Sequence, residues 1–342
     1  MISDALEKTG NVRQIGGIET AVLDNGPGRG VRVASVNTGT PLWYQVVIDR
    51  ALDIGEAFYA GKSLAWLSHG GITTPQPGAC KGLQWLDFFG GGLLTTCGLT
   101  HIGAPEKDES GAERGLHGRI SNLPAELVNV EQPDLRSGNP RMSITALVRQ
   151  TSVFGPCLEL HRTISSYLGR SEIKISDKVI NCSNTPVPHM LLYHCNFGYP
   201  LVNEGAAINW DGKFVTRGTP ADDAIFASDH DYTTCSAPLD DHCGGGEACA
   251  FITPEQDENG FCHAGISNPQ SDLSVVVEFK QEQLPCLTNW QHWGRFEYVT
   301  ALEPGTNHPI GQNAARSQKK LIMLEPGEER NYDLTLSAGA LK

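Results

Sequence analysis

The chain has 342 residues and a formal net charge of −13 at pH 7. This acidity argues against a nucleic-acid partner, because proteins that bind phosphate backbones concentrate Lys and Arg on one face. The longest apolar stretches, such as residues 271–279, fall far short of the roughly 20 residues that span a bilayer, and the N-terminal segment lacks the apolar core of a secretory signal, so we expect a soluble, cytoplasmic protein without a membrane partner.

Short runs rich in Val, Ile, Leu, Thr and aromatic residues recur between clusters of Gly, Pro, Asn and Asp, which is typical of an all-β protein. In chain order, we expect strands at residues 31–39, 42–49, 141–150, 158–168, 172–181, 189–197, 273–280, 296–304, 319–326 and 330–339. Residues 158–164 and 172–180 alternate apolar and polar side chains, so one face of each strand packs while the other meets solvent. This alternation favours antiparallel pairing and predicts a large antiparallel β-sandwich.

No Pro- or Ser-rich linker divides the chain and no internal repeat is visible, so a single domain over residues 1–342 is the simpler interpretation. The Gly-rich stretches at residues 88–98 and 240–248 lack the Lys of a GxxxxGK[ST] phosphate loop. We interpret them as tight turns or as backbone that approaches a ligand. The ten cysteines include no CxxC pair, and we expect them to be reduced, mostly buried thiols.

Charged side chains first interrupt an apolar run at Asp49, Arg50 and Asp53. Charges inside an apolar strand are costly unless they are paired. Arg50 therefore either pairs with one of the two Asp residues or contacts a ligand.

A second polar segment brings His101, His117 and Arg119 close together in the sequence. Gly115 and Gly118 lie near His117 and allow a turn that points its imidazole into a cleft. A lone His is more often a structural hydrogen-bonding residue, but the local density of His and Arg favours a site at His117.

The expected strand at residues 189–197 carries His189 and His194, five positions apart. Side chains alternate between the two faces of a strand, so these two imidazoles point to opposite faces and only one can reach a given cleft. His194 is the better site candidate because the segment then runs through Asn196 and Tyr199 to Pro200, which suits a strand that leads into a binding surface. The alternative is a core His with satisfied hydrogen bonds.

The last polar segment combines Trp290, Gln291, His292, Trp293 and Glu303. A pyranose offers apolar C–H faces and a rim of hydroxyl groups, so aromatic faces beside amide and carboxylate groups suit a sugar site. Both Trp residues could equally belong to the core. No His falls in an HExxH spacing and no Ser lies in a GxSxG elbow, so the sequence favours neither a metal site nor a hydrolase triad.

The sequence resembles the galactose mutarotase-like superfamily, and within it an uncharacterised branch of aldose 1-epimerase-like proteins. The resemblance rests on RALDIG at residues 50–55, GGLLTTCGL at 91–99, GLHGR at 115–119 and ALEP at 301–304, and it extends from about Asp49 to the last strand. It implies a supersandwich fold and interconversion of sugar anomers without a cofactor or a metal. It also implies that His117 binds the sugar, that His194 is the general acid and that Glu303 is the general base.

Two features of the superfamily have no clear counterpart in this sequence. The early sugar-binding Arg is missing from its usual segment, and Arg50 or Arg119 is the candidate substitute. The Asp that holds a sugar hydroxyl is also unassigned, with Asp240 and Asp241 as candidates. The predicted substrate-binding set is therefore Arg50, His101, His117, Arg119, Asp241, Trp290 and Gln291.

These inferences predict an isomerase of the aldose 1-epimerase type whose partner is a small-molecule sugar, and they allow a homo-oligomer. Two other readings remain open. A lyase or an epimerase that acts at another carbon of a sugar acid or oxidised sugar would need the same His and Glu types, because proton abstraction next to a carbonyl also uses an acid and a base. The other is a carbohydrate-binding protein that uses the same cleft without catalysis.

Overall fold

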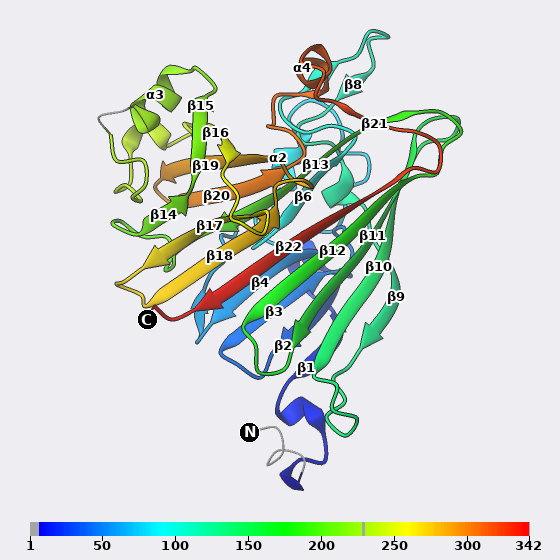
Figure 1. Ribbon diagram of the computed structural model, residues 1–342, viewed down its shortest axis with the longest axis vertical. Coiled ribbons are helices and arrows are strands. Elements are labelled where there is room, and N and C mark those ends of the chain that lie inside the picture. The colour runs from blue at the N-terminus through cyan, green and yellow to red at the C-terminus, as the bar shows by residue number, and fades with distance from the viewer. Residues whose placement is uncertain (1–6, 228–229, 342) are drawn as a thin grey trace.

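The computed structural model describes residues 7–227 and 230–341; the first six residues of the N-terminal segment lie outside this range. Antiparallel strands dominate the structure, and the expected all-β sandwich is confirmed (Figure 1). Short helices lie in the connections: α2 (Gln84–Asp87), α3 (Pro220–Phe226), α4 (Gln312–Ser317), and the 3-10 helices η1 (Val12–Gln14), η2 (Gly26–Gly28), η3 (Ile120–Asn122) and η4 (Asp240–His242). None of the helices in the described ranges is long and apolar enough to cross a membrane.

Within the described ranges, the strands form three large sheets and one two-stranded sheet. The first large sheet has the order β1 (Gly17–Val22), β2 (Arg32–Asn37), β3 (Leu42–Val47), β4 (Asp53–Tyr59), β5 (Lys62–Ser63). The second has the order β14 (Ala207–Trp210), β17 (Phe261–Asn268), β18 (Leu273–Lys280), β22 (Glu329–Gly339), β12 (Glu172–Asn181), β11 (Cys157–Tyr167), β10 (Arg141–Thr151), β9 (Glu126–Glu131). The third has the order β15 (Gly212–Thr216), β16 (Ala248–Pro254), β19 (Cys286–Gly294), β20 (Glu297–Gly305), β13 (Val187–Phe197), β21 (Ile322–Leu324), with β6 (Thr95–Leu99) paired to β13; the small sheet joins β7 (Glu106–Lys107) to β8 (Glu113–Arg114).

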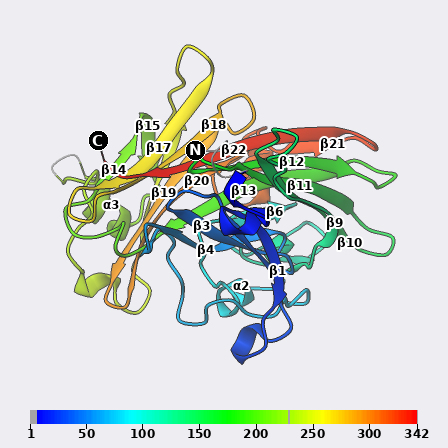
Figure 2. The same cartoon turned by 90° about the horizontal axis from the view of Figure 1, so that it is seen from below.

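The first sheet packs against the second across a shared core (Figures 1 and 2). Burial along β11 and β12 alternates residue by residue, as the sequence pattern of these segments predicts. The buried phenol of Tyr44 on β3 lies 2.9 Å from the hydroxyl of Ser166 on β11, which joins the two sheets by a hydrogen bond. One hydrophobic cluster includes Val36, Leu160 and Leu302, one from each large sheet.

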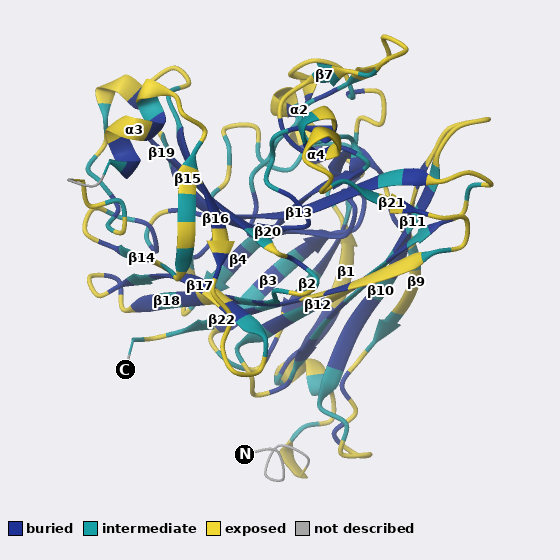
Figure 3. Cartoon of the chain, turned by 45° about the horizontal axis from the view of Figure 1, so that its top comes forward, coloured by how far each residue is buried: buried dark blue, intermediate teal, exposed yellow. Residues whose placement is uncertain are grey.

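Strand β13 of the third sheet is buried on both faces. Strand β15, at the edge of the same sheet, and helix α3 are partly exposed (Figure 3). His189 and His194 point to opposite faces of β13, as their odd separation predicts. The Nδ1–H of His189 donates to the Leu99 carbonyl oxygen at 2.9 Å, and the Tyr332 hydroxyl donates to His189 Nε2 at 2.8 Å. Both ring nitrogens of His189 therefore have hydrogen-bond partners in the core. The opposite face of β13 carries His194.

Burial lowers the pKa of His189 to about 4. The unfolded chain takes up a proton there below about pH 6.5, whereas the folded chain does so only below about pH 4, so acidification between these values favours unfolding. We expect His189 to contribute a loss of about 3 kcal/mol in the free energy of unfolding over this interval. Urea unfolding at pH 7 and pH 4.5 should show a smaller loss in His189→Gln than in the wild type. The matched control His161→Gln, at a partly exposed side chain, should keep the wild-type loss, and an equal loss in His189→Gln would contradict this assignment.

All ten cysteines are free thiols; five of them are buried, and Cys182 and Cys243 are exposed.

Candidate active site

A pocket of about 650 Å³ lies on the face of the third sheet that carries His194. Strands β13, β16, β19 and β20 supply one side, and the loops around α2 and before Gly118 supply the other. The lining residues are Trp66, Ser68, Leu83, Trp85, Leu86, Phe89, Gly103, Ala104, Pro105, Leu116, His117, His194, Arg217, Gly245, Glu247, Cys249, Phe251, Thr288, Trp290, His292, Glu297, Glu303 and Pro309. It therefore combines residues from the second, third and last polar segments of the sequence, and Asp49, Arg50 and Asp53 are absent from its lining.

His194 and Glu303 are placed side by side by the pairing of β13 with β20. The register runs from Leu192 opposite Gly305 to Phe197 opposite Thr300, which sets His194 opposite Glu303 on neighbouring strands. His194 Nε2 and Glu303 Oε1 are 3.2 Å apart, and both side chains are almost completely buried. Residues opposite each other in a ladder show their side chains on the same face, so this contact follows from the strand register.

The protein environment shifts the proton affinities of this pair in opposite directions. Burial lowers the pKa of His194 to about 4. Burial raises the pKa of Glu303 well above its usual value; Glu247 acts in the same direction and Arg217 opposes it. Because the Glu303 carboxyl group resists losing its proton and His194 resists gaining one, we expect the pair to share a single proton across the contact between Glu303 and His194 Nε2. Such a pair can donate a proton and accept one at neighbouring positions.

His117 reaches the pocket from a strained turn. Its backbone has a φ of 54°, in the left-handed region, and the next residue, Gly118, has a φ of 72°. A Cβ at Gly118 would lie 2.3 Å from the carbonyl oxygen of Gly98, so only glycine fits there. The Gly103 N–H donates to His117 Nδ1 at 3.5 Å, which leaves Nε2–H as the donor of the ring. Burial lowers the pKa of His117, and this imidazole is a neutral donor.

Aromatic rings enclose the His194–Glu303 pair. The Phe89 and Trp290 rings lie 5.4 Å and 5.5 Å from the His194 ring, between ring centroids. Trp85 stacks on Phe89 at 4.2 Å and lies 4.9 Å from the His117 ring. These faces exclude water from the pair and offer flat apolar surfaces to a ligand.

Arg217 and Glu247 form a polar wall that the sequence did not indicate. Arg217 Nη1 donates to Glu247 Oε1 at 2.5 Å, and its Nη2 pairs with Asp222 at 3.0 Å. Glu247 Oε2 in turn accepts a hydrogen bond of 2.7 Å from Trp290 Nε1. Glu247 belongs to the Gly-rich stretch at residues 240–248, which we interpret from its sequence as a tight turn or as backbone that approaches a ligand, and this position is its one signal in the sequence. Arg217 follows β15 with no motif around it.

Five predicted substrate-binding residues do not line this pocket, and four of them are His101, Arg119, Gln291 and Asp241. His101 is buried behind its wall, with Nε2 bound to the Ala104 carbonyl oxygen at 2.9 Å. Arg119 donates to the Thr151 carbonyl oxygen at 2.6 Å on the exposed side of its turn. Gln291 points to the opposite face of β19 from Trp290, where it binds the Tyr232 carbonyl oxygen. Asp241 is exposed in η4, and its neighbour Asp240 pairs with Arg295.

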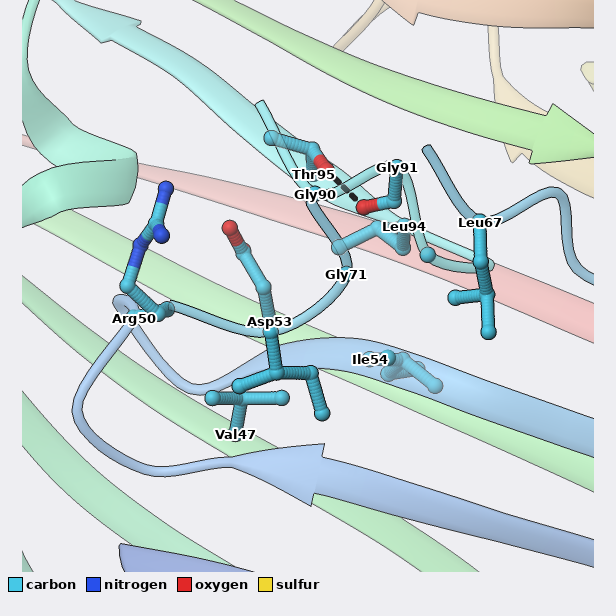
Figure 4. Close-up of a pocket in the computed structure, with 13 residues that line it drawn as sticks. Val47, Arg50, Asp53, Ile54, Leu67, Gly71, Gly90, Gly91, Leu94 and Thr95 are labelled. Atoms are coloured by element: carbon cyan, nitrogen blue, oxygen red, sulfur yellow. Dashed lines mark hydrogen bonds between the residues drawn. The ribbon is translucent and has the colours of Figure 1, made fainter. Parts of the chain in front are cut away.

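Arg50 also lies outside this pocket, in a separate cavity of about 40 Å³ that it shares with Asp53 (Figure 4). Its guanidinium donates to Thr73 Oγ1 at 2.9 Å and to the Phe88 carbonyl oxygen at 2.8 Å. Neither Asp makes a hydrogen-bonded pair with it, because Asp49 binds Arg32 and Asp53 binds Arg162. Arg50 therefore links the segments that carry Thr73 and Phe88 by hydrogen bonds.

His117, His194, Trp290 and Glu303 are the predicted site residues that the structure brings together. Within the described part of the chain, no group of three or more His, Cys, Asp and Glu side chains is placed to hold a metal ion.

A family model described as Domain of unknown function (DUF4432) matches residues 28–338. No curated protein matches the sequence. Among solved structures, a "putative aldose 1-epimerase" from Klebsiella pneumoniae superposes with a TM-score of 0.85 at 24% identity, over 96% of this chain and 86% of that one. A galactose mutarotase-like protein from Clostridium acetobutylicum gives 0.66 at 14% identity, over 96% and 100%. A second "putative aldose 1-epimerase", from Escherichia coli K12, gives 0.59 at 13% identity, over 95% and 100%. The chain has the galactose mutarotase-like fold and belongs to the DUF4432 family.

Proposed function

We propose that this protein is an aldose 1-epimerase, an isomerase that interconverts the α and β anomers of a sugar by opening and closing its ring. The observation that carries the proposal is the buried contact of 3.2 Å between His194 Nε2 and Glu303 Oε1 inside an aromatic pocket. Binding alone does not require a coupled acid and base at the end of a cleft. The fold shared with the mutarotase-like proteins supports the same assignment.

Ring opening moves a proton from the anomeric hydroxyl group to the ring oxygen. Proton exchange across the His194–Glu303 contact produces an imidazolium beside a carboxylate. His194 then protonates the ring oxygen while Glu303 accepts the proton of the anomeric hydroxyl, and the ring opens to the aldehyde. Rotation about the C1–C2 bond and reversal of both transfers give the other anomer. Each proton transfer contributes roughly 10² to 10⁴ in rate.

Other pocket residues suit the remaining groups of a pyranose. The Nε2–H of His117 and the carboxylate of Glu247 can donate to and accept from sugar hydroxyl groups. Thr288 lines the pocket, and its buried Oγ1 makes no hydrogen bond within the described residues, so this hydroxyl group is a further candidate partner for a ligand. Trp85, Phe89 and Trp290 face the apolar C–H surfaces.

The direct test follows the optical rotation of freshly dissolved α-anomers of neutral and acidic aldoses, with and without the protein. Faster equilibration of at least one sugar, lost in His194→Asn, is the expected result. A product inverted at C-2 or an unsaturated product would instead indicate an epimerase acting at another carbon or a lyase. Saturable sugar binding with no accelerated reaction would indicate a binding protein.

The pH dependence of the rate should reflect the single proton of the pair. Because the pKa of His194 is about 4, acidification through this value adds a second proton and removes the acceptor, so the rate should fall. On the alkaline side the rate should fall where the pair loses its last proton, above the ordinary pKa of a Glu, because the pKa of Glu303 is raised. Initial rates corrected for the protein-free reaction give this profile. An acid limb near pH 6.5, the value of an unperturbed His, would contradict it.

A further inference from the structure

The pocket continues along strands β19 and β20, well beyond the His194–Glu303 pair. Thr288 pairs with Glu303 in this ladder, His292 pairs with Val299, and Gly294 pairs with Glu297. Thr288, Trp290 and His292 stand at alternate positions of β19 and share one face, as Glu303 and Glu297 do on β20. All five line the pocket. The pocket is therefore a groove that runs along the two strands from Glu303 to Glu297.

The length of this groove exceeds one sugar ring. Glu303 and Glu297 are six residues apart, which corresponds to roughly 20 Å at about 3.3 Å per residue. A pyranose with its hydroxyl groups is about 6 Å across, from bond lengths near 1.5 Å. Measured along the strand backbones, a ring placed on His194 and Glu303 therefore ends short of Glu297, and His292 lies between these two levels of the ladder.

The volume of the pocket also exceeds the volume of one sugar ring. A hexose has about 12 non-hydrogen atoms, each smaller than the roughly 30 Å³ share of a water molecule in the liquid, so it fills less than ~360 Å³. The pocket has a volume of about 650 Å³, so about 290 Å³ or more remains beside one hexose for a further group.

The distal part of the groove has the chemistry of a sugar subsite. The Trp290 and His292 rings lie nearly parallel, with an interplanar angle of 11° and centroids 6.0 Å apart. His292 Nδ1–H donates to the Gly246 carbonyl oxygen at 2.5 Å, which fixes the ring. The Glu297 carboxylate lies 3.6 Å from His292 Nε2 and is about half exposed, so it can accept hydrogen bonds from hydroxyl groups. A carboxylate at this position repels phosphate and carboxylate substituents.

We propose that the substrate is a reducing disaccharide or longer oligosaccharide whose reducing-end ring occupies the His194–Glu303 end. Its second ring lies at Trp290 and His292 and donates hydroxyl hydrogen bonds to Glu297. The inference rests on the proposed function and makes His292 and Glu297 determinants of substrate specificity.

The test compares kcat/KM for anomer equilibration of glucose and galactose with that of maltose, cellobiose and lactose. At least one disaccharide should exceed its parent monosaccharide by about tenfold or more. Glu297→Gln, at a half-exposed side chain that folding does not require, should remove most of this advantage and leave the monosaccharide value within about twofold. His292→Ala should do the same, and Glu282→Gln, an exposed carboxylate outside the pocket, is the matched control.

Equal or lower values for all three disaccharides, with monosaccharides still accelerated, would overturn this inference and leave the proposed function intact. An equal loss for both substrate classes in Glu297→Gln would also overturn it. If no sugar of either class is accelerated, the proposed function fails, and the substrate assignment fails with it.

Discussion

Replacing Glu303 by Gln is expected to lower kcat for anomer exchange by roughly 10² to 10⁴. The substitution keeps the size and the polarity of the side chain but removes the proton acceptor opposite His194. Because the pair acts as one unit with one proton, the loss cannot be recovered by raising the pH. Initial rates by polarimetry at saturating sugar measure the effect.

Sugar binding should survive this substitution, because the aromatic walls, His117 and Glu247 are unchanged. Isothermal titration with the sugar should give a dissociation constant within about tenfold of the wild type. The matched control is Glu329→Gln, a half-exposed carboxylate on β22 that pairs with Lys178. Wild-type kcat in Glu303→Gln would remove Glu303 from the mechanism.

The second large effect concerns stability, and Arg162→Met should lower the free energy of unfolding by about 3–5 kcal/mol. Arg162 is completely buried on β11. It binds Asp177 through Nε and Nη2 at 2.9 Å and 2.6 Å, and it binds Asp53 through Nη1 at 3.0 Å. Its removal leaves two carboxylates in the core without their cation, and Tyr193 and Thr96 alone remain to hydrogen-bond them. Urea denaturation monitored by tryptophan fluorescence measures the change.

The matched control is Arg149→Met on β10, where the guanidinium forms exposed pairs with Glu126 and Glu159. Exposed pairs contribute little, so this variant should lose less than about 1 kcal/mol. Arg162→Lys keeps the charge but loses the two-pronged contact with Asp177, and it should lie between the two. An Arg162→Met variant as stable as Arg149→Met would contradict the role of the buried cluster.

The sequence predicted the fold well because its main signals are local. Alternating burial in residues 158–164 and 172–180 follows from the two-residue period of a strand, and the same period separates His189 from His194. The Gly-flanked His117 also lies in the predicted cleft, although His117 itself carries a left-handed backbone conformation that the glycines alone do not indicate.

The sequence failed where partners come from distant segments. The sequence predicted that Arg50 either pairs with an Asp from its own run or contacts a ligand, yet its guanidinium binds the Thr73 side chain and the Phe88 carbonyl oxygen. The true partner of Asp53 is Arg162, more than one hundred residues later in the chain. Such pairings depend on which sheets face each other, and strand periodicity does not encode that.

The polar wall of the pocket was missed for the same reason. Arg217 and Glu247 are 30 residues apart and meet through the pairing of β15 with β16, and Trp290 joins them from β19. None of these three positions carries a motif that links it to the others. The sequence indicated the chemistry of the site through its His and Glu residues and left this wall to the structure.

Proton NMR of a freshly dissolved α-anomer in deuterated buffer tests the central claim most directly. With catalytic amounts of protein, the account predicts that the anomeric α signal decays at a rate proportional to protein concentration. The α/β ratio should end at its protein-free value, and every carbon-bound proton should be retained. Decay at the buffer rate for every sugar tried, or loss of the C-2 proton signal to deuterium, would contradict anomer exchange by His194 and Glu303.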